Sequence, residues 1–122
     1  MFTGIIETLG EVVDKVLEGS NVHFDITSSI THDLKVDQSV SHNGVCLTVV
    51  ELSGNRYRVT AVEETLQRSN LNMLTLGSLV NLERCMLNNG RFDGHIVQGH
   101  VDQTGVCTGI EEMDGSGLFS FE

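Results

Sequence analysis

The 122-residue chain contains no proline and no tryptophan, and aromatic residues amount to only 5% of it. An average chain of this length carries about six prolines, so the turns here must depend on Gly, Asn, Asp and Ser. Basic residues are also few, because 7 Lys and Arg stand against 17 Asp and Glu and leave a formal net charge of −10. Nucleic acids and anionic membranes attract basic surfaces, so neither is expected as a partner.

Long apolar segments and paired cysteine motifs are missing as well. No hydrophobic run approaches the ~20 residues that span a bilayer, and residues 1–11 have no basic stretch followed by an apolar one. The three cysteines, Cys46, Cys85 and Cys107, are odd in number and far apart. They predict neither a disulfide framework nor a metal site, and a reducing cytoplasm is the expected compartment.

What the chain does contain is a period of two residues, which is typical of β-strands with one buried face. This alternation predicts strands at residues 3–17, 22–27, 45–50, 56–61 and 79–85. A turn at Ser53-Gly54-Asn55 predicts a hairpin, and a bulge or bend is expected at Gly10. Helical signal is limited to one turn within 29–34 and two turns within 63–70. The pattern indicates an all-β fold, a small closed barrel with one or two short helices.

An internal repeat sets the domain organisation. Residues 4–10 resemble residues 99–105 at an offset of 95 residues, and Phe24 coincides with Phe119 at the same offset. The tail therefore predicts the first strands of a second copy. We expect a complete N-terminal barrel over residues 1–86, followed by an incomplete second barrel over residues 87–122.

Six blocks of sequence, in order along the chain, resemble the signatures of the riboflavin synthase family of lumazine-binding barrels. They are Met1–Glu7, Ser39-Val40 leading into Asn43–Val49, Glu64–Leu66, Ser69–Leu71, Val80–Arg84 and Gly94–Asp102. The resemblance implies a six-stranded Greek-key closed barrel, two such barrels in tandem, and a trimer of full-length chains. It also implies an enzyme that converts two 6,7-dimethyl-8-ribityllumazine molecules into riboflavin and 5-amino-6-ribitylamino-pyrimidinedione, without a metal or separate cofactor.

The resemblance leaves two other functions open. Lumazine proteins share the barrel and hold a lumazine or flavin without turnover, and a truncated chain could be a non-catalytic interaction fragment. Phe2, Ser39, Cys46 and His100 together favour the enzyme, and they are the catalytic candidates. With the second barrel incomplete, we expect impaired turnover and a homo-oligomer, with a dimer as the form favoured by unpaired strand edges.

Cys46 and Thr48 lie two residues apart on a predicted strand and so point to the same face. The resemblance implies that this face contacts the pteridine ring of the substrate. Both are also ordinary small strand residues, so their spacing alone leaves the matter open. No base is fixed beside Cys46 by the local sequence, so a ring contact is expected rather than a covalent nucleophile.

Four further binding candidates surround the start of the predicted helix: Ala61, Val62, Glu64 and Thr65. The residues alone indicate a surface acid and a helix cap. The resemblance implies contacts from this segment to the carbonyl edge of the ring.

The remaining candidates are glycines, histidines and the N-terminus. His95 and His100 follow Gly94 and Gly99, and a histidine near neutrality can take a proton from the substrate's 7-methyl group. His100 is preferred, although either side chain could simply pack against backbone. The resemblance also places Phe2, Thr3, Gly4, His95 and Gly99 at the substrate interface, with core packing as the alternative for Phe2.

Overall fold

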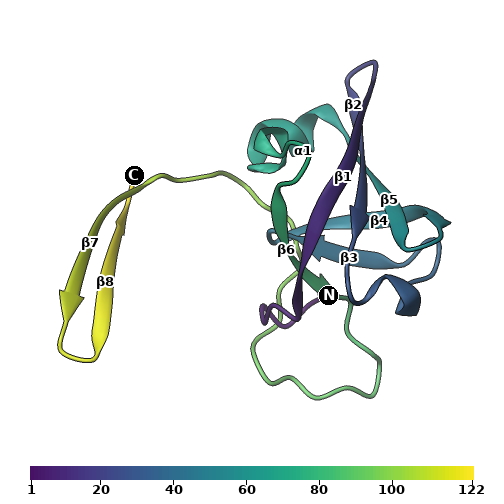
Figure 1. The fold of residues 1–122 in the computed structure, drawn as a ribbon. Coiled ribbons are helices and arrows are strands. Elements are labelled where there is room, and N and C mark those ends of the chain that lie inside the picture. The colour runs from purple at the N-terminus through teal and green to yellow at the C-terminus, as the bar shows by residue number, and fades with distance from the viewer.

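The computed structural model describes residues 1–122 and consists of a closed barrel and a separate two-stranded sheet (Figure 1). Six antiparallel strands close the barrel in the order β1-β2-β5-β4-β3-β6, which confirms the predicted all-β Greek-key fold. The barrel strands are β1 (Thr8–Glu18), β2 (Asn21–Thr27), β3 (Ser39–His42), β4 (Val45–Ser53), β5 (Arg56–Ala61) and β6 (Leu79–Arg84). The helical elements are α1 (Glu63–Arg68) and two short 3-10 turns, η1 (Thr31–Asp33) and η2 (Leu71–Met73). No helix has the length and apolarity that crossing a bilayer requires.

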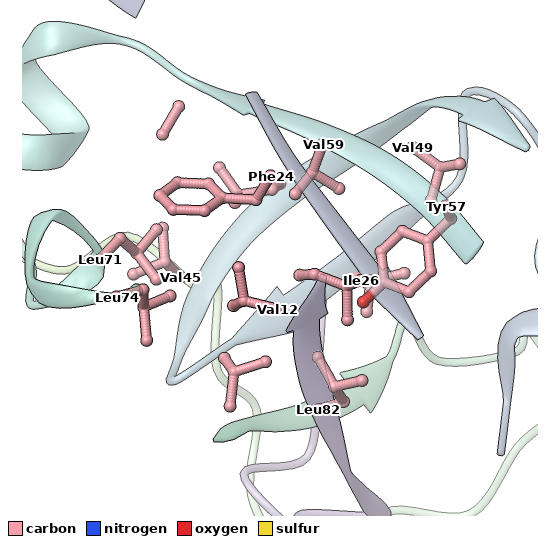
Figure 2. Close-up of a cluster of buried hydrophobic side chains, with 14 of the residues drawn as sticks. Val12, Phe24, Ile26, Val45, Val49, Tyr57, Val59, Leu71, Leu74 and Leu82 are labelled. Atoms are coloured by element: carbon pink, nitrogen blue, oxygen red, sulfur yellow. The ribbon is translucent and has the colours of Figure 1, made fainter. Parts of the chain in front are cut away.

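The barrel interior is filled by the apolar residues that alternate along the strands (Figure 2). On β4, Val45, Leu47 and Val49 are buried, whereas Cys46 is half-buried and Thr48 is exposed. The predicted separation of the two faces of this strand is therefore confirmed. Leu71, the first residue of η2, and Leu74, which follows η2, join the same core and close one end of the barrel.

Two expectations for the first strand are wrong. The strand begins at Thr8 rather than at residue 3, because the preceding N–H groups of Thr3 and Gly4 donate to the Glu83 carboxylate instead of to a strand. The irregularity in β1 lies between Val12 and Asp14, not at Gly10. Gly10 instead allows close packing, since a Cβ there would lie 2.7 Å from side-chain atoms of both Ile26 and Leu82.

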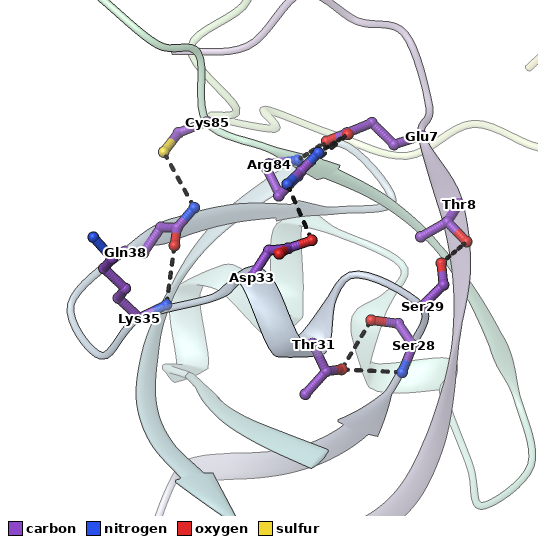
Figure 3. A network of polar contacts seen from close by, with 10 residues as sticks. All are labelled: Glu7, Thr8, Ser28, Ser29, Thr31, Asp33, Lys35, Gln38, Arg84 and Cys85. Atoms are coloured by element: carbon purple, nitrogen blue, oxygen red, sulfur yellow. Dashed lines mark hydrogen bonds and ion pairs between the residues drawn. The ribbon is translucent and has the colours of Figure 1, made fainter. Parts of the chain in front are cut away.

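A polar network joins the start of β1 to the end of β6 (Figure 3). The Arg84 guanidinium pairs with the Glu7 carboxylate at 2.8 Å and with Asp33 of η1 at 3.6 Å. Hydrogen bonds from Arg84 lower the pKa of Glu7. The network holds the closing seam of the barrel together at its rim.

The second sheet consists of β7 (Cys107–Met113) and β8 (Ser116–Phe121), and it extends away from the barrel with its residues exposed (Figure 1). Its pairing has an irregularity between Cys107 and Gly109. These positions follow Val12 and Asp14 by 95 residues, so the irregularity of β1 recurs at the same place in the repeat. The hairpin thus repeats the register of the β1–β2 pair, including the place of its irregularity.

A histidine is buried inside the barrel. The Nδ1–H of His42 donates to the Val40 carbonyl at 3.0 Å, so Nε2 is unprotonated and accepts from the Tyr57 hydroxyl at 2.8 Å. Burial lowers the pKa of His42 to about 4 and raises that of Tyr57. Protonation of His42 therefore opposes folding.

The free energy of unfolding is expected to fall by about 2–3 kcal/mol between pH 7 and pH 4.5 through His42 alone. Below about pH 6.5 the unfolded chain takes up a proton on this imidazole, whereas the native chain does so only near pH 4, so acid favours unfolding. Urea unfolding at the two pH values measures the loss. His42→Gln should show a smaller loss, and His32→Gln, at an exposed position, should show the full one. Equal losses in all three proteins would contradict the prediction.

Candidate functional site

The site is built around residues 94–101, which we call the crossing segment. It follows β6 and runs back along the barrel without joining it as a strand. Val97 exchanges two backbone hydrogen bonds with Phe2, at 2.8 and 2.9 Å. The Gly99 carbonyl then accepts the N–H of Cys46 on β4 at 2.8 Å. The crossing segment therefore touches both the N-terminus and the outer side of β4.

Gly99 makes this approach sterically feasible. Its φ of +88° lies in the left-handed region. A Cβ at this position would lie 2.7 Å from Cys46 Cβ and 3.0 Å from the Phe2 ring. Only glycine satisfies both the conformation and the space.

A cavity of about 170 Å³ opens where β4, α1 and the crossing segment meet. Its lining residues are Val45, Cys46, Glu64, Thr65, Arg68, Ser69, Gly99, His100 and Val101. The walls combine a thiol, two hydroxyls and an imidazole with a Glu64–Arg68 ion pair at 3.1 Å. This mixture of donors, acceptors and apolar atoms suits a polar aromatic ring, and its imidazole can exchange a proton with a bound molecule.

Five of the predicted site residues line this cavity together: Cys46, Glu64, Thr65, Gly99 and His100. They come from three separate stretches of sequence, and the fold brings them to one place. The structure also shows where four other candidates lie, outside the cavity lining. Thr48 is exposed on the outer face of β4 and is paired with Ser39 on β3. The Ala61 side chain is fully buried in the core, while Val62 precedes α1 and is 50% exposed.

The N-terminal candidates form a second cluster. Phe2 is buried, and its ring lies beside Gly99. The Thr3 carbonyl accepts the N–H of His95 at 3.0 Å, and the His95 ring lies beside Gly4. Thr3, Gly4 and His95 do not line the cavity, but they hold the segment that does.

Three polar residues were not among the predicted site residues: Arg68 and Ser69, which line the cavity, and Glu83 behind the N-terminus. Ser69 and Glu83 lie in blocks that resemble the family signatures, but no role was predicted for them. Arg68 follows Glu64 by four residues on α1, and this spacing places both side chains on one helix face. That signal was present in the sequence. No local pattern predicts the contacts of Glu83, whose partners lie about 80 residues away.

A larger hollow of about 610 Å³ lies elsewhere, beside Glu7, Arg84 and Cys85. Figure 3 shows these three side chains. None of the predicted site residues lines it. Its Arg84 is already paired with Glu7 and Asp33. No group of three His, Cys, Asp or Glu side chains is arranged to hold a metal ion.

Comparison with known proteins gave concordant matches. A family model described as the lumazine binding domain matches residues 3–85. Riboflavin synthase of Bacillus subtilis is 46% identical over 95% of this chain and 54% of its own length. Riboflavin synthase of Saccharomyces cerevisiae is 38% identical over 100% of this chain and 55% of its own. The chain thus spans about half the length of the curated relatives it matches.

Solved structures with the same fold include two complexes of LumP. One, with 6,7-dimethyl-8-(1'-D-ribityl) lumazine, matches with a TM-score of 0.81 and 22% identity over 93% of this chain and 64% of LumP. The other, with riboflavin, has a TM-score of 0.81 and 23% identity over 93% of this chain and 62% of LumP. At this identity the likeness concerns the fold alone.

Proposed function

The chain belongs to the lumazine-binding domain family, and from that premise we propose that it acts in riboflavin synthesis as the N-terminal part of a riboflavin synthase. The reaction joins two 6,7-dimethyl-8-ribityllumazine molecules, transfers a four-carbon unit between them, and yields riboflavin and 5-amino-6-ribitylamino-pyrimidinedione. The observation that carries the proposal is the convergence of Cys46, Thr65 and His100 on one cavity. Relatives named riboflavin synthase, at 38–46% identity, support it.

We place the edge of the lumazine ring in the cavity between β4 and the crossing segment. The cavity is smaller than the roughly 300–1,000 Å³ typical of small-molecule sites. The rest of the ligand would therefore extend over the outer face of β4, toward Thr48 and Ser39. Thr65 and the backbone at Val62 would then meet the polar edge of the ring.

His100 is the proposed base. It is exposed at the cavity wall, where its imidazole can take a proton from the 7-methyl group of a bound lumazine. The resulting carbanion can attack the second lumazine. Holding the two molecules in register removes an entropic barrier of roughly 7–11 kcal/mol. The Cys46 thiol packs against the ring in this arrangement, and the residues need no metal or separate cofactor.

A second copy of the chain is the proposed partner. The hairpin of β7 and β8 exposes Ile110, Phe119 and Phe121, and these apolar side chains favour association. Light scattering measures the assembly, and a monomer of 13.3 kDa would contradict it. Because Cys46, Cys85 and Cys107 are all unpaired thiols, the reducing cytoplasm remains the proposed compartment.

Incubation with 6,7-dimethyl-8-ribityllumazine tests the function directly. Growth of riboflavin fluorescence means turnover. Saturable quenching of lumazine fluorescence without product means a binding module, which is the alternative function. If the incubation gives neither product nor saturable quenching, the proposed function is wrong.

Thr48→Val is expected to weaken lumazine or riboflavin binding about two- to tenfold. The substitution keeps the volume and the strand preference but removes one hydroxyl, which corresponds to about 0.5–1.5 kcal/mol for a neutral hydrogen bond. Fluorescence titration measures the change. Thr27→Val, on β2, is the control and should bind normally. Unchanged affinity in Thr48→Val would place Thr48 outside the site.

A further inference from the structure

Residues 1–4, which we call the N-terminal strap, are held in place although they are not a strand of the barrel. The Met1 carbonyl accepts the Met86 N–H at 2.9 Å, and Phe2 exchanges two hydrogen bonds with Val97. Chain termini usually fray unless specific contacts hold them. Contacts other than the strand pairing of the barrel therefore hold the strap in place.

The side-chain group that makes most of these contacts is the carboxylate of Glu83, near the end of β6. Glu83 is only 4% exposed. Its Oε2 accepts the Thr3 N–H at 2.6 Å and the Thr3 hydroxyl at 2.8 Å, and its Oε1 accepts the Gly4 N–H at 3.0 Å. All three donors belong to the strap. Hydrogen bonds to a carboxylate are about twice as strong as hydrogen bonds between neutral groups, so these three contacts hold the strap firmly.

The strap in turn fixes one wall of the ligand cavity. Phe2 pairs with Val97 in the middle of the crossing segment, and the Phe2 ring packs beside Gly99, 3.0 Å from where a Cβ would stand. The crossing segment supplies three lining residues, of which His100 is the proposed base. A continuous series of contacts therefore runs from Glu83 through the strap to this wall.

We infer that Glu83 is a positioning residue for the ligand site, acting through Thr3 and Phe2 on the crossing segment. The Glu83 side chain does not line the cavity between β4, α1 and the crossing segment. Its carboxylate orders the strap, and the strap holds Gly99 and His100 against β4. The role in ligand binding rests on the proposed function, whereas the ordering of the strap does not.

Glu83→Gln tests the inference in the full 122-residue chain. The carboxamide has the same shape but only one acceptor oxygen, so its NH₂ must face at least one of the three donors. Loss of a charged hydrogen bond corresponds to about a ten- to hundredfold change in the local opening equilibrium. We expect the Phe2, Val97 and Cys46 amides to exchange with solvent faster by this factor, while amides of β2 and β5 keep their rates. Riboflavin affinity should fall at least about tenfold.

Glu11→Gln, on the exposed side of β1, is the matched control and should change neither exchange nor affinity. If Glu83→Gln does not fold, Thr3→Val removes the hydroxyl that donates to Glu83 and accepts the Ile5 N–H. It leaves the carboxylate and both backbone donors in place and should accelerate the same three amides severalfold. Unchanged exchange at these amides, or equal acceleration throughout the barrel, would overturn the inference. If the unchanged chain does not bind riboflavin, the proposed function fails, and the exchange rates still decide whether Glu83 orders the strap.

Discussion

Gly99→Ala is expected to weaken riboflavin binding about 30- to 1,000-fold while the barrel remains folded. An alanine at φ +88° is strained, and its Cβ would lie 2.7 Å from Cys46 Cβ. Backbone strain and overpacking together amount to about 2–4 kcal/mol. The crossing segment is not a barrel strand, so moving it away from β4 relieves the collision at a lower free-energy cost than disrupting the barrel. We therefore expect the variant to lose one wall of the cavity, and with it riboflavin affinity, while the barrel stays folded.

Gly115→Ala is the matched control for this experiment. Gly115 has a φ of +81°, nearly that of Gly99, but nothing lies within 4 Å of an added Cβ. It therefore carries similar backbone strain without the collision, in the turn between β7 and β8. Fluorescence titration of both variants separates the two effects. Equal riboflavin affinities in Gly99→Ala and Gly115→Ala would contradict the predicted site.

His100→Gln is expected to lower turnover of 6,7-dimethyl-8-ribityllumazine by about 10²–10⁴-fold, the usual contribution of general acid–base catalysis. Glutamine keeps a polar side chain at the cavity wall but cannot accept the methyl proton. The dissociation constant of the substrate should change far less, because the group acts in the transition state. Measuring kcat and the dissociation constant in the same preparation separates these effects.

His32→Gln, at an exposed position on η1, serves as the comparison and should turn over normally. The pH dependence of kcat adds a second criterion, because loss of the base should remove the part of this dependence that the base causes. Near-normal turnover with an unshifted profile would mean that His100 only packs at the wall.

The parts of the fold that were predictable depend on local patterns. Alternation along β4 assigned Cys46 and Thr48 to the outer face, and the turn at Gly54 located the hairpin correctly. β3 was not identified as a strand, because its four residues are too few to show a period. The start of β1 was misplaced, because a buried carboxylate far along the sequence binds Thr3 and Gly4.

The candidate site was likewise only partly predictable from the sequence. The resemblance to known signatures named Cys46, Thr65 and His100 as candidates, and the fold brings them from distant stretches of sequence to one cavity. Arg68 could have been found from its spacing to Glu64. Glu83 lies in the Val80–Arg84 block, but no role could be assigned to it, since a buried glutamate near the end of a strand has no local pattern that separates it from a solvent-exposed one.

The two hydrogen bonds between Phe2 and Val97 join equivalent positions of the 95-residue repeat. The two residues are 95 positions apart, the same offset that relates Gly4 to Gly99, so each is the other's counterpart in the repeat. Each donates its N–H to the other's carbonyl. A pair of equivalent positions that bond reciprocally defines a local twofold axis, which is the rule for an isologous interface between two identical subunits. The chain thus contains, within one molecule, the kind of contact that ordinarily joins two protomers of a dimer.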